Sequence, residues 1–393
     1  MPALPARVLR DSSLSATAAG FVTVLVGFAS SVVIVFQAAQ AVGASQAQIG
    51  SWILALGLGM GVSCIALSLR YGVPVVTAWS TPAAAMLAAS HTGLPLPEAI
   101  GAFVVCAVLA AVAGFSGLFE KTLHRIPLPL AAGMLAGVLL RFGLDTFVAL
   151  KTQPLLVLAM LVTYLVMRRW WARYAVIACL LVGVLVAAAS GTLHLEQAHL
   201  TLAQPDWVTP RFSLAALLGI ALPMFVVTMA SQNVPGVAVI RASGFEVPVS
   251  PVIGWTGVLT ALLAPLGAFS LNLAAITAAI CMGPEAHPDR TRRYMAAVWA
   301  GLFYLVVGLF GATVVTLLAA FPKELVMAIA GIALLGTLGG ALGTAVKDEG
   351  SREAALVTFL ITASGLSLAG IGAAFWGLVG GVLTLLVLKP RKA

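Results

Sequence analysis

The chain has 393 residues, of which 61% are hydrophobic and only 9% are charged. A water-soluble domain of this size carries far more charge on its surface, so the composition excludes soluble classes and predicts a polytopic membrane protein. The formal net charge of +8 fits basic cytoplasmic loops better than nucleic-acid binding, because Lys and Arg accumulate on the cytoplasmic side of membrane proteins.

Apolar runs of about the length that a bilayer requires occur twelve times along the chain. They cover residues 14–37, 49–69, 98–118, 127–145, 154–168, 174–191, 212–233, 251–268, 294–319, 322–345, 353–369 and 371–388. Two further stretches, 73–90 and 269–283, are apolar but interrupted by proline or polar residues. Counting both as crossings predicts fourteen transmembrane segments, of which the first is an uncleaved helix.

The distribution of basic residues bears on this count. With a cytoplasmic N-terminus and fourteen crossings, 17 of the 21 Lys and Arg residues lie inside, and the four outside are Arg141, Lys151, Arg211 and Lys323. Omitting only one interrupted stretch would move the basic cluster at 167–175 outside, against the positive-inside rule. The pattern therefore favours both stretches as crossings or neither, and their half-polar character favours both. We expect both termini to be cytoplasmic, in a bacterial inner membrane.

The two halves of the chain repeat a similar spacing of polar residues. Gln37 precedes Thr81 by 44 residues, and Gln232 precedes Asn272 by 40 residues. Seven crossings in each half make the second half inverted relative to the first, and matching interrupted segments in inverted halves indicate a transporter binding site. The predicted units are a first repeat, a linker and a second repeat, at residues 14–191, 192–211 and 212–388.

The first interrupted stretch reads VPVVTAWSTPAAAM. Its β-branched and aromatic residues at 74–79 favour a strand. Thr81 suits a helix N-cap, and Pro82 suits the first helical position. We therefore predict a strand followed by a half-helix from residue 82 to residue 90.

The second interrupted stretch, GAFSLNLAAITAAICMG, predicts extended chain at 267–271, Asn272 as the N-cap and a half-helix at 273–282. The inverted symmetry aims both half-helix N-termini at the centre of the bilayer. Their unpaired N–H groups and positive dipole ends would form an anion site without Lys or Arg. The alternative is a pair of kinked structural helices whose Ser and Thr side chains bond to their own backbone. The matching of the two segments favours the site.

Amide side chains are unusual inside apolar segments, where they commonly bond between helices. Gln37 and Gln40 fit such packing and ligand contact equally well, whereas Gln232 interrupts its run and favours ligand contact. Trp79 and Phe269 each lie shortly before a predicted half-helix, where an aromatic ring can stack on a ring-bearing substrate. Ordinary core packing is the alternative for each ring.

The sequence carries no pattern for catalysis, a metal or a cofactor. The four cysteines lie in separate apolar segments without a CxxC pair, and neither HExxH nor paired intramembrane aspartates occur. No carboxylate lies near either predicted half-helix N-terminus, which argues against a cation site. Arg141 and Asp145 are four residues apart, and a surface ion pair is their expected role.

On these residues, the chain resembles the benzoate transporter family, BenE. The stretches GFASSVVIVFQAAQAVGAS, GVPVVTAWSTPAA and SLNLAAITAAICMG look like recurrent stretches of that family, and the resemblance extends from residue 10 to residue 390. The family is similar in architecture to nucleobase–proton symporters of the uracil-permease type and to sulfate transporters. The resemblance implies an all-α membrane fold of fourteen segments in two inverted repeats of seven, with segments three and ten part strand and part half-helix.

The resemblance also implies a core domain and a gate domain with the substrate between segments three and ten. The core covers residues 14–118 and 212–319, and the gate covers residues 127–191 and 322–388. In this resemblance, uracil permeases carry a glutamate where this chain has Gln232 and a second glutamate where it has Leu271. They share the asparagine at the position of Asn272. Both departures remove an acid, which favours a substrate that is itself anionic and leaves the proton route of those relatives in doubt.

The combined hypothesis is a secondary active transporter that imports benzoate or a similar aromatic carboxylate with protons by alternating access. The predicted substrate-binding residues are Gln37, Trp79, Ser80, Thr81, Gln232, Phe269 and Asn272, with Ser80, Thr81 and Asn272 as caps of the half-helices. The expected partners are the carboxylate, protons and the lipid bilayer, a homodimer is considered, and no cofactor, metal or nucleic acid is expected. The alternatives are a passive anion channel and a transporter of another small organic anion, while an enzyme is disfavoured.

Overall fold

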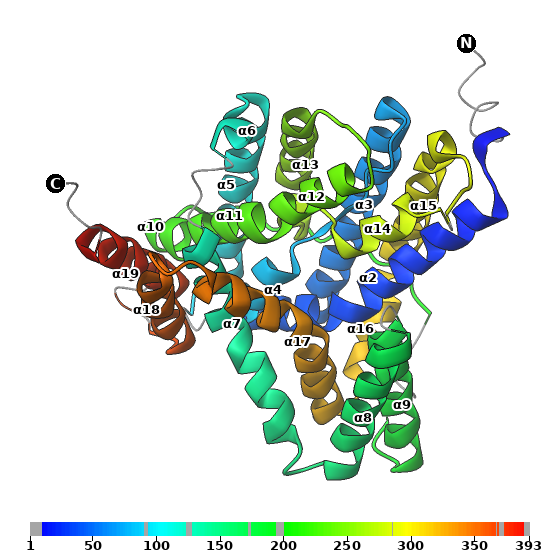
Figure 1. The fold of residues 1–393 in the computed structure, drawn as a ribbon. Coiled ribbons are helices and arrows are strands. Elements are labelled where there is room, and N and C mark those ends of the chain that lie inside the picture. The colour runs from blue at the N-terminus through cyan, green and yellow to red at the C-terminus, as the bar shows by residue number, and fades with distance from the viewer. Residues whose placement is uncertain are drawn as a thin grey trace.

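The computed structural model describes residues 10–89, 93–122, 128–171, 174–193, 200–284, 286–366, 368 and 373–388. This part of the chain is mostly helical and contains one small sheet (Figure 1). The α-helices are α2 (Leu14–Ala41), α3 (Gln46–Tyr71), α4 (Thr81–Ala89), α5 (Leu96–Phe115), α6 (Leu118–Thr122), α7 (Leu128–Ala149), α8 (Pro154–Trp170), α9 (Ala175–Ala189), α10 (Leu214–Ala216), α11 (Leu222–Thr228), α12 (Val234–Ala242), α13 (Val249–Leu263), α14 (Ile276–Met282), α15 (Tyr294–Leu309), α16 (Gly311–Ala319), α17 (Lys323–Lys347), α18 (Arg352–Ala363) and α19 (Ala373–Leu388). The strands are β1 (Thr77–Trp79) and β2 (Leu271–Leu273), and the shorter helical turns are η3 (Leu217–Ala221), η4 (Met229–Asn233), η5 (Ala264–Leu266) and η6 (Arg290–Arg292).

Each of the twelve predicted apolar runs overlaps at least one described helix. Among the described residues, six continuous helical stretches are long and apolar enough to cross a membrane, and the number is eight if each of two bent pairs counts as one span. One of these pairs joins α15 to α16 with a bend of 64°. Residue 90, residues 194–199 of the predicted linker and residues 371–372 of the last run lie outside the described residues.

Helix α3 illustrates how local sequence fixes the helix ends and the packing. Ser45 Oγ accepts from the Gln48 N–H at 3.3 Å and Gln48 Oε1 accepts from the Ser45 N–H at 2.9 Å, which completes a capping box. The helix ends at Gly72, whose φ of 64° is left-handed. A Cβ at Gly57 would lie 2.5 Å from the Cα of Gly308 on α15. Glycine at this crossing therefore lets α3 and α15 pack backbone to backbone, as is common between membrane helices.

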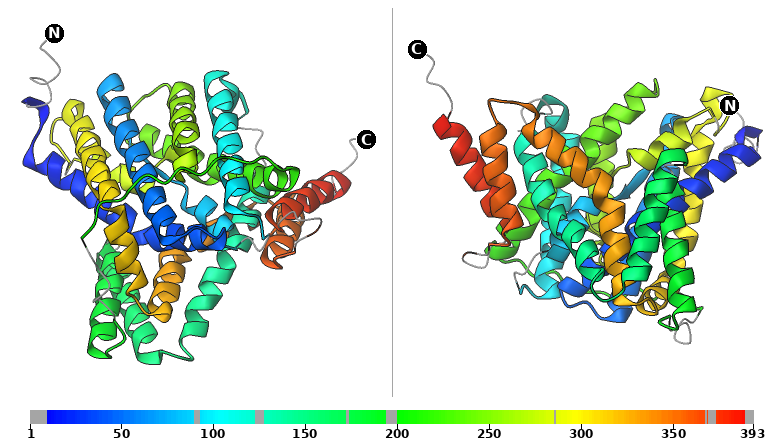
Figure 2. Two further views of the ribbon diagram at one scale, coloured as in Figure 1. Left: turned by 180° about the vertical axis from the view of Figure 1, so that it is seen from behind. Right: turned by 60° about the horizontal axis from the view of Figure 1, so that its bottom comes forward.

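The helices form two packing groups. In the first group α3 packs on α15, α5 packs on α13, and α2 packs on α4, α14 and α15. In the second group α7 packs on α17 and α18, α8 packs on α9, and α18 packs on α19. The groups meet where α17 contacts α2 and where α7 contacts α4. Figures 1 and 2 show α18 and α19 at one edge of the molecule and the start of α2 at the opposite edge.

The chain just before α2 is fastened to α15 by Asp11. Its carboxyl accepts hydrogen bonds from Arg10 Nε and from the Tyr294 hydroxyl, both at 2.9 Å, and Arg292 Nε lies 3.8 Å away. The hydrogen bond from Arg10, together with that from Tyr294, holds the pKa of Asp11 below its ordinary value, although burial acts in the opposite direction. Asp11 is therefore charged at neutral pH.

Candidate functional site

The two interrupted stretches meet in an antiparallel two-stranded sheet. β1 and β2 pair in the register Thr77 with Leu273, Ala78 with Asn272 and Trp79 with Leu271. The ladder gains one backbone hydrogen bond at each end, from Ser80 to Ser270 at 3.1 Å and from Ala274 to Val76 at 2.9 Å. This pairing fixes the start of α4 relative to the start of α14.

The first half-helix begins one residue earlier than predicted, and its N-cap is Ser80. Ser80 Oγ accepts from the Ala83 N–H at 3.2 Å, and α4 starts at Thr81. The prediction that Thr81 caps this helix is therefore wrong by one residue. Serine and threonine are both good caps, and proline is tolerated in the first helical turn, so local sequence does not decide between them.

Thr81 is left with unused hydrogen-bond donors at the start of α4. Pro82 has no N–H, and the N–H groups of Ala83 and Ala84 are bonded to Ser80. Within the described chain, neither the N–H nor the hydroxyl of Thr81 has a hydrogen-bond partner. The residue is half-buried and lines a cavity. Because the first turn of a helix favours negative charge, Thr81 offers two donors to an anion.

The second half-helix differs more from the prediction. Asn272 lies inside β2 and is fully buried, so it caps no helix, and α14 starts at Ile276 without a side-chain cap. Asn272 Nδ2 donates to Ser270 O at 2.9 Å, while Oδ1 is buried without a partner among the described residues. The predicted cap is wrong because pairing with Ala78 extends the strand through Asn272, and this pairing is not visible in local sequence.

The π-helical turn η4 gives two neighbouring amides different roles. Asn233 is buried, and its Oδ1 accepts from the Leu273 N–H of β2 at 3.0 Å. Gln232 instead lines the cavity that Thr81 lines, and its side-chain amide has no hydrogen-bond partner in the described part of the chain. Single π turns inside helices are frequent at functional sites. This one holds β2 with one amide and presents the other to the cavity.

A central cavity of about 490 Å³ lies at the junction of the two packing groups. Helices α2, α3, α4, α14 and α15 of the first group contribute to its walls, and so do α8, α9 and α17 of the second group. The elements β1, η4 and α12 complete the lining. Its volume falls in the range of small-molecule sites. A relative movement of the two groups would therefore change the shape of this cavity directly.

Trp79 forms a rigid part of the central cavity wall. Its Nε1 donates to Ser31 Oγ at 2.9 Å, and its ring packs edge-to-face on Phe28 with centroids 5.3 Å apart. Ser31 also lines the cavity, and its hydroxyl donates to Gly27 O. Sequence analysis missed Ser31, because a serine in the small-residue stretch GFASSVV signals ordinary helix packing.

Arg168 contributes a positive charge to the central cavity. It lies one turn after Tyr164 on the same face of α8, and both side chains line the cavity. Arg168 is exposed and makes no hydrogen bond or ion pair with any residue that the structure describes. No Asp or Glu side chain lines the cavity in the described ranges, so its field favours an anion. Sequence analysis missed Arg168, since a basic residue at the end of an apolar helix indicates only a membrane boundary.

The central cavity brings together only part of the predicted residue set. Trp79, Thr81 and Gln232 line it. Ser80 and Asn272 are fully buried and do not line it, so they position the neighbouring backbone. These two residues contribute to the site through α4 and β2 and not through their own side chains.

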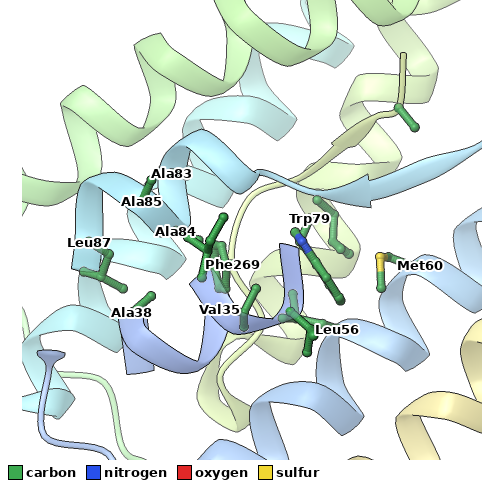
Figure 3. Packing of buried hydrophobic residues seen from close by; sticks show 14 of the residues in the cluster. Val35, Ala38, Leu56, Met60, Trp79, Ala83, Ala84, Ala85, Leu87 and Phe269 are labelled. Carbon is green, nitrogen blue, oxygen red and sulfur yellow. The ribbon is translucent and has the colours of Figure 1, made fainter. Parts of the chain in front are cut away.

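Phe269 lies in the apolar core and does not line the central cavity. Its ring packs against Trp52 and Phe103, with centroids 5.9 and 5.7 Å away. Figure 3 shows Phe269 and Trp79 in one buried cluster with Val35 and Leu56. The packing alternative therefore describes Phe269, whereas Trp79 belongs to both the core and the cavity wall.

A second cavity of about 250 Å³ lies at the other end of α4, and we name it the peripheral cavity. Its polar side chains are Gln37, Gln40, Arg141 and Asp145. Arg141 and Asp145 do not form the expected ion pair with each other within 4 Å. Gln37 and Gln232 therefore belong to different cavities, although their positions in the two halves correspond.

Comparison with known proteins identifies the family of this chain. A family model described as benzoate membrane transport protein, BenE, matches residues 10–387. The chain belongs to this family. It is 50% identical over 371 residues to the inner membrane protein YdcO of Escherichia coli (strain K12), covering 94% of this chain and 95% of that protein. It is 39% identical over 384 residues to the benzoate membrane transport protein of Acinetobacter baylyi (strain ATCC 33305 / BD413 / ADP1), covering 98% of both. This BenE family member is thus a membrane transport protein and not an enzyme.

Solved structures share the fold of this BenE family member at low sequence identity. The transmembrane domain of a cyanobacterium bicarbonate transporter, BicA, matches with a TM-score of 0.54 and 14% identity, covering 95% of this chain and 96% of that one. The murine Solute Carrier 26 family member A9 anion transporter in the inward-facing state matches with a TM-score of 0.53 and 14% identity, covering 94% of this chain and 68% of that one. At this identity, the likeness establishes a transporter fold alone.

Proposed function

We propose that this protein imports benzoate or a similar aromatic carboxylate, coupled to protons, across a bacterial inner membrane. The Acinetobacter baylyi relative, which is named for benzoate, is 39% identical along nearly the whole chain. The central cavity is large enough for a single-ring substrate. Its described walls carry hydrogen-bond donors and a cation without an acid, as an anionic substrate requires.

The observation that carries this proposal is the pair of unused donors on Thr81. In the proposed complex, the carboxylate accepts from the Thr81 N–H and hydroxyl and from the amide of Gln232. Arg168 attracts the anion from the mouth of the cavity, and Trp79 packs against the ring. Hydrogen bonds to a charged acceptor are roughly twice as strong as neutral ones, so the site should prefer benzoate to uncharged rings.

The proposed transport cycle is alternating access between a core and a gate. We assign residues 14–118 and 212–319 to the core and residues 127–191 and 322–388 to the gate, which correspond to the two packing groups. The shared walls of the central cavity support this division, because rigid-body movement of one group exposes such a site to one side at a time. The paired β1–α4 and β2–α14 segments support fourteen segments in two inverted repeats.

We further propose that both termini and the Arg168 end of the central cavity face the cytoplasm. The support is the distribution of Lys and Arg along the chain. Extracellular thiol reagents should fail to label a cysteine that replaces Arg169 in a variant of otherwise unchanged activity. Strong labelling from outside would reject this orientation.

Uptake into proteoliposomes tests the proposed function. With an inwardly directed proton gradient, purified protein should accumulate radiolabelled benzoate above the external concentration, and a protonophore should abolish the accumulation. Unlabelled benzoate should compete better than benzamide or uracil. Equilibration without accumulation would support a passive anion channel, and accumulation of another organic anion but not benzoate would reject the substrate.

A further inference from the structure

The peripheral cavity lies on the same elements as the central cavity. On α2, Ser31 lines the central cavity and Gln37 lines the peripheral one. On α4, the corresponding residues are Thr81 and Ala88, and α17 likewise contributes to both cavities. Thr81 and Ala88 are about 10 Å apart at the helical rise per residue. The two cavities therefore lie end to end along the boundary between the packing groups.

A buried layer separates the two cavities in this structure. Residues 32–36 of α2 and residues 83–87 of α4 are buried, as is Ile332 of α17. The adjacent Gly331 lets α17 approach Thr146 of α7 so closely that a Cβ has no room. Side chains and backbone from both packing groups thus close the central cavity on its peripheral side.

The polar groups of the peripheral cavity suit a carboxylate. Arg141 supplies a positive charge, and Gln37 and Gln40 supply amide groups. Gln37 is half-buried, and its Oε1 is buried without a hydrogen-bond partner among the described residues. An unsatisfied buried polar atom is costly, and a half-turn of the amide would place donors where Oε1 now lies. Gln37 can therefore donate a hydrogen bond to the carboxylate of a ligand in this cavity.

Asp145 opposes the charge of Arg141 within the same cavity. It lies one helical turn further along α7, and both side chains line the cavity. The acid lowers the affinity of the cavity for an anion without cancelling the amide donors. Weak binding suits a place that a substrate must enter and leave in each cycle.

We propose that the peripheral cavity is an external loading site, at which the carboxylate of the substrate binds beside Arg141 before the path to the central cavity opens. This inference rests on the function and the orientation proposed above. Arg141 is one of only four Lys and Arg residues that the fourteen-segment topology places outside. A cation at the mouth of a cleft raises the local concentration of an anion and its rate of association.

The test compares transport of radiolabelled benzoate from the two sides of the membrane. Initial rates are measured against concentration in right-side-out and in inside-out vesicles. Arg141→Gln should raise the external KM about three- to tenfold, as expected for a partly exposed charge pair, and should change the internal KM by less than about twofold. Arg141→Lys, which keeps the charge, should restore most of the external affinity.

Arg168→Gln is the matched control, because it removes the same charge from the central cavity near its proposed cytoplasmic mouth. It should raise the internal KM more than the external KM, which is the reverse of the effect of Arg141→Gln. Asp145→Asn tests the same cavity in the opposite direction and should lower the external KM. If Arg141→Gln fails to fold, Asp145→Asn tests the loading site in its place, because aspartate and asparagine have the same size.

Three outcomes would overturn the loading site. The first is an unchanged external KM in Arg141→Gln, or in Asp145→Asn if the arginine variant does not fold. The second is an equal loss from both sides, which indicates a structural role for Arg141. The third is a raised internal KM in Arg141→Gln, which would place the cavity on the cytoplasmic side. Absence of benzoate transport by the wild-type protein would instead reject the proposed function itself.

Discussion

The two interrupted segments occupy equivalent places in the two halves of the chain, but they use their polar residues differently. In the first segment, Ser80 caps α4, and Thr81 lines the central cavity with donors that have no partner among the described residues. In the second segment, α14 is shorter and has no side-chain cap. The amides of Asn272 and Asn233 bond to the backbone of residues 270–273.

If the central cavity binds the substrate as proposed, the two segments contribute unequally to binding. A polar side chain that bonds to backbone is unavailable to a ligand, and a helix start that is capped by its own neighbour frees the next residue. We therefore expect the first segment to determine affinity for the substrate and the second segment to determine stability. Each of the following variants tests one side of this division.

Thr81→Val should produce the largest effect, on affinity. The change removes the hydroxyl from the proposed carboxylate site while keeping the size of the side chain. A lost hydrogen bond to a charged group costs roughly 1.5–3 kcal/mol, which is about a 10- to 150-fold increase in Kd at 1.4 kcal/mol per factor of ten. Isothermal titration with benzoate in detergent gives the Kd directly.

The matched comparison for Thr81→Val is Thr277→Val, because Thr277 lines the central cavity from α14. We expect its Kd to rise less than that of Thr81→Val by about an order of magnitude. Equal effects of the two variants would contradict the division between the segments. A larger effect of Thr277→Val would assign the carboxylate to the second segment.

Asn233→Ala should mainly reduce stability. The change leaves the buried N–H of Leu273 without its acceptor, at a cost of about 1–3 kcal/mol. Asn272→Ala should cost less, because it also removes an Oδ1 atom that is already unsatisfied. Thermal unfolding of both variants in the same detergent measures the order. If Asn272→Ala is the more destabilising, the second segment is held differently from this description.

Ser80→Ala should have a smaller effect, of about 1 kcal/mol on the free energy of unfolding, as is typical for loss of an N-cap. It also frees the N–H of Ala83 beside Thr81, so benzoate affinity should change by less than about tenfold. Chemical unfolding and titration on the same preparation separate the two quantities. An affinity loss as large as that of Thr81→Val would mean that Ser80 itself contacts the substrate.

Asp11→Asn should have the smallest effect and should leave the affinity for benzoate unchanged, because Asp11 lines neither cavity and bonds to Tyr294 at the start of α15. Folding lowers the pKa of Asp11, so its charged form stabilises the protein above the ordinary value of 3.8. This stabilisation is lost as the pH falls through the folded-state pKa. At pH 7 the free energy of unfolding of the variant should therefore be lower than that of the wild type by less than about 1 kcal/mol. This difference should vanish toward pH 3, as measured by unfolding at several pH values. A difference in the free energy of unfolding that stays constant with pH would exclude the charge of Asp11 as its cause.

Much of the helical fold is predictable from the sequence, because long apolar runs have few alternatives to helix in a bilayer. The exact caps of the half-helices are not. Ser80 and Thr81 are chemically equivalent candidates, and only the hydrogen bond to Ala83 distinguishes them. Asn272 looks like a cap until the strand that contains Ala78 pairs with it. That contact joins residues far apart in the chain, and no local pattern encodes it.

The candidate site was predictable only where a polar or aromatic residue interrupted an apolar run or lay inside an interrupted stretch. Trp79 and Thr81 are such residues, Gln232 interrupts its own apolar run, and all three line the central cavity. Ser31 and Arg168 lie on α2 and α8, outside the two interrupted stretches, where serine and arginine have common structural roles. Their position in the cavity depends on how helices rotate and cross.

The pairing of β1 with β2 also imposes an order of events on biosynthesis. The strands belong to opposite halves of the chain, and at about 5–20 residues per second a ribosome makes Leu271 roughly 10–40 s after Trp79. During this delay, the translocation machinery or neighbouring helices must shelter the open backbone of the first strand from lipid, since hydrocarbon cannot satisfy its N–H and C=O groups. The first half of the chain therefore cannot complete its fold until β2 has been synthesised, and the transport pathway is among the last parts of the molecule to form.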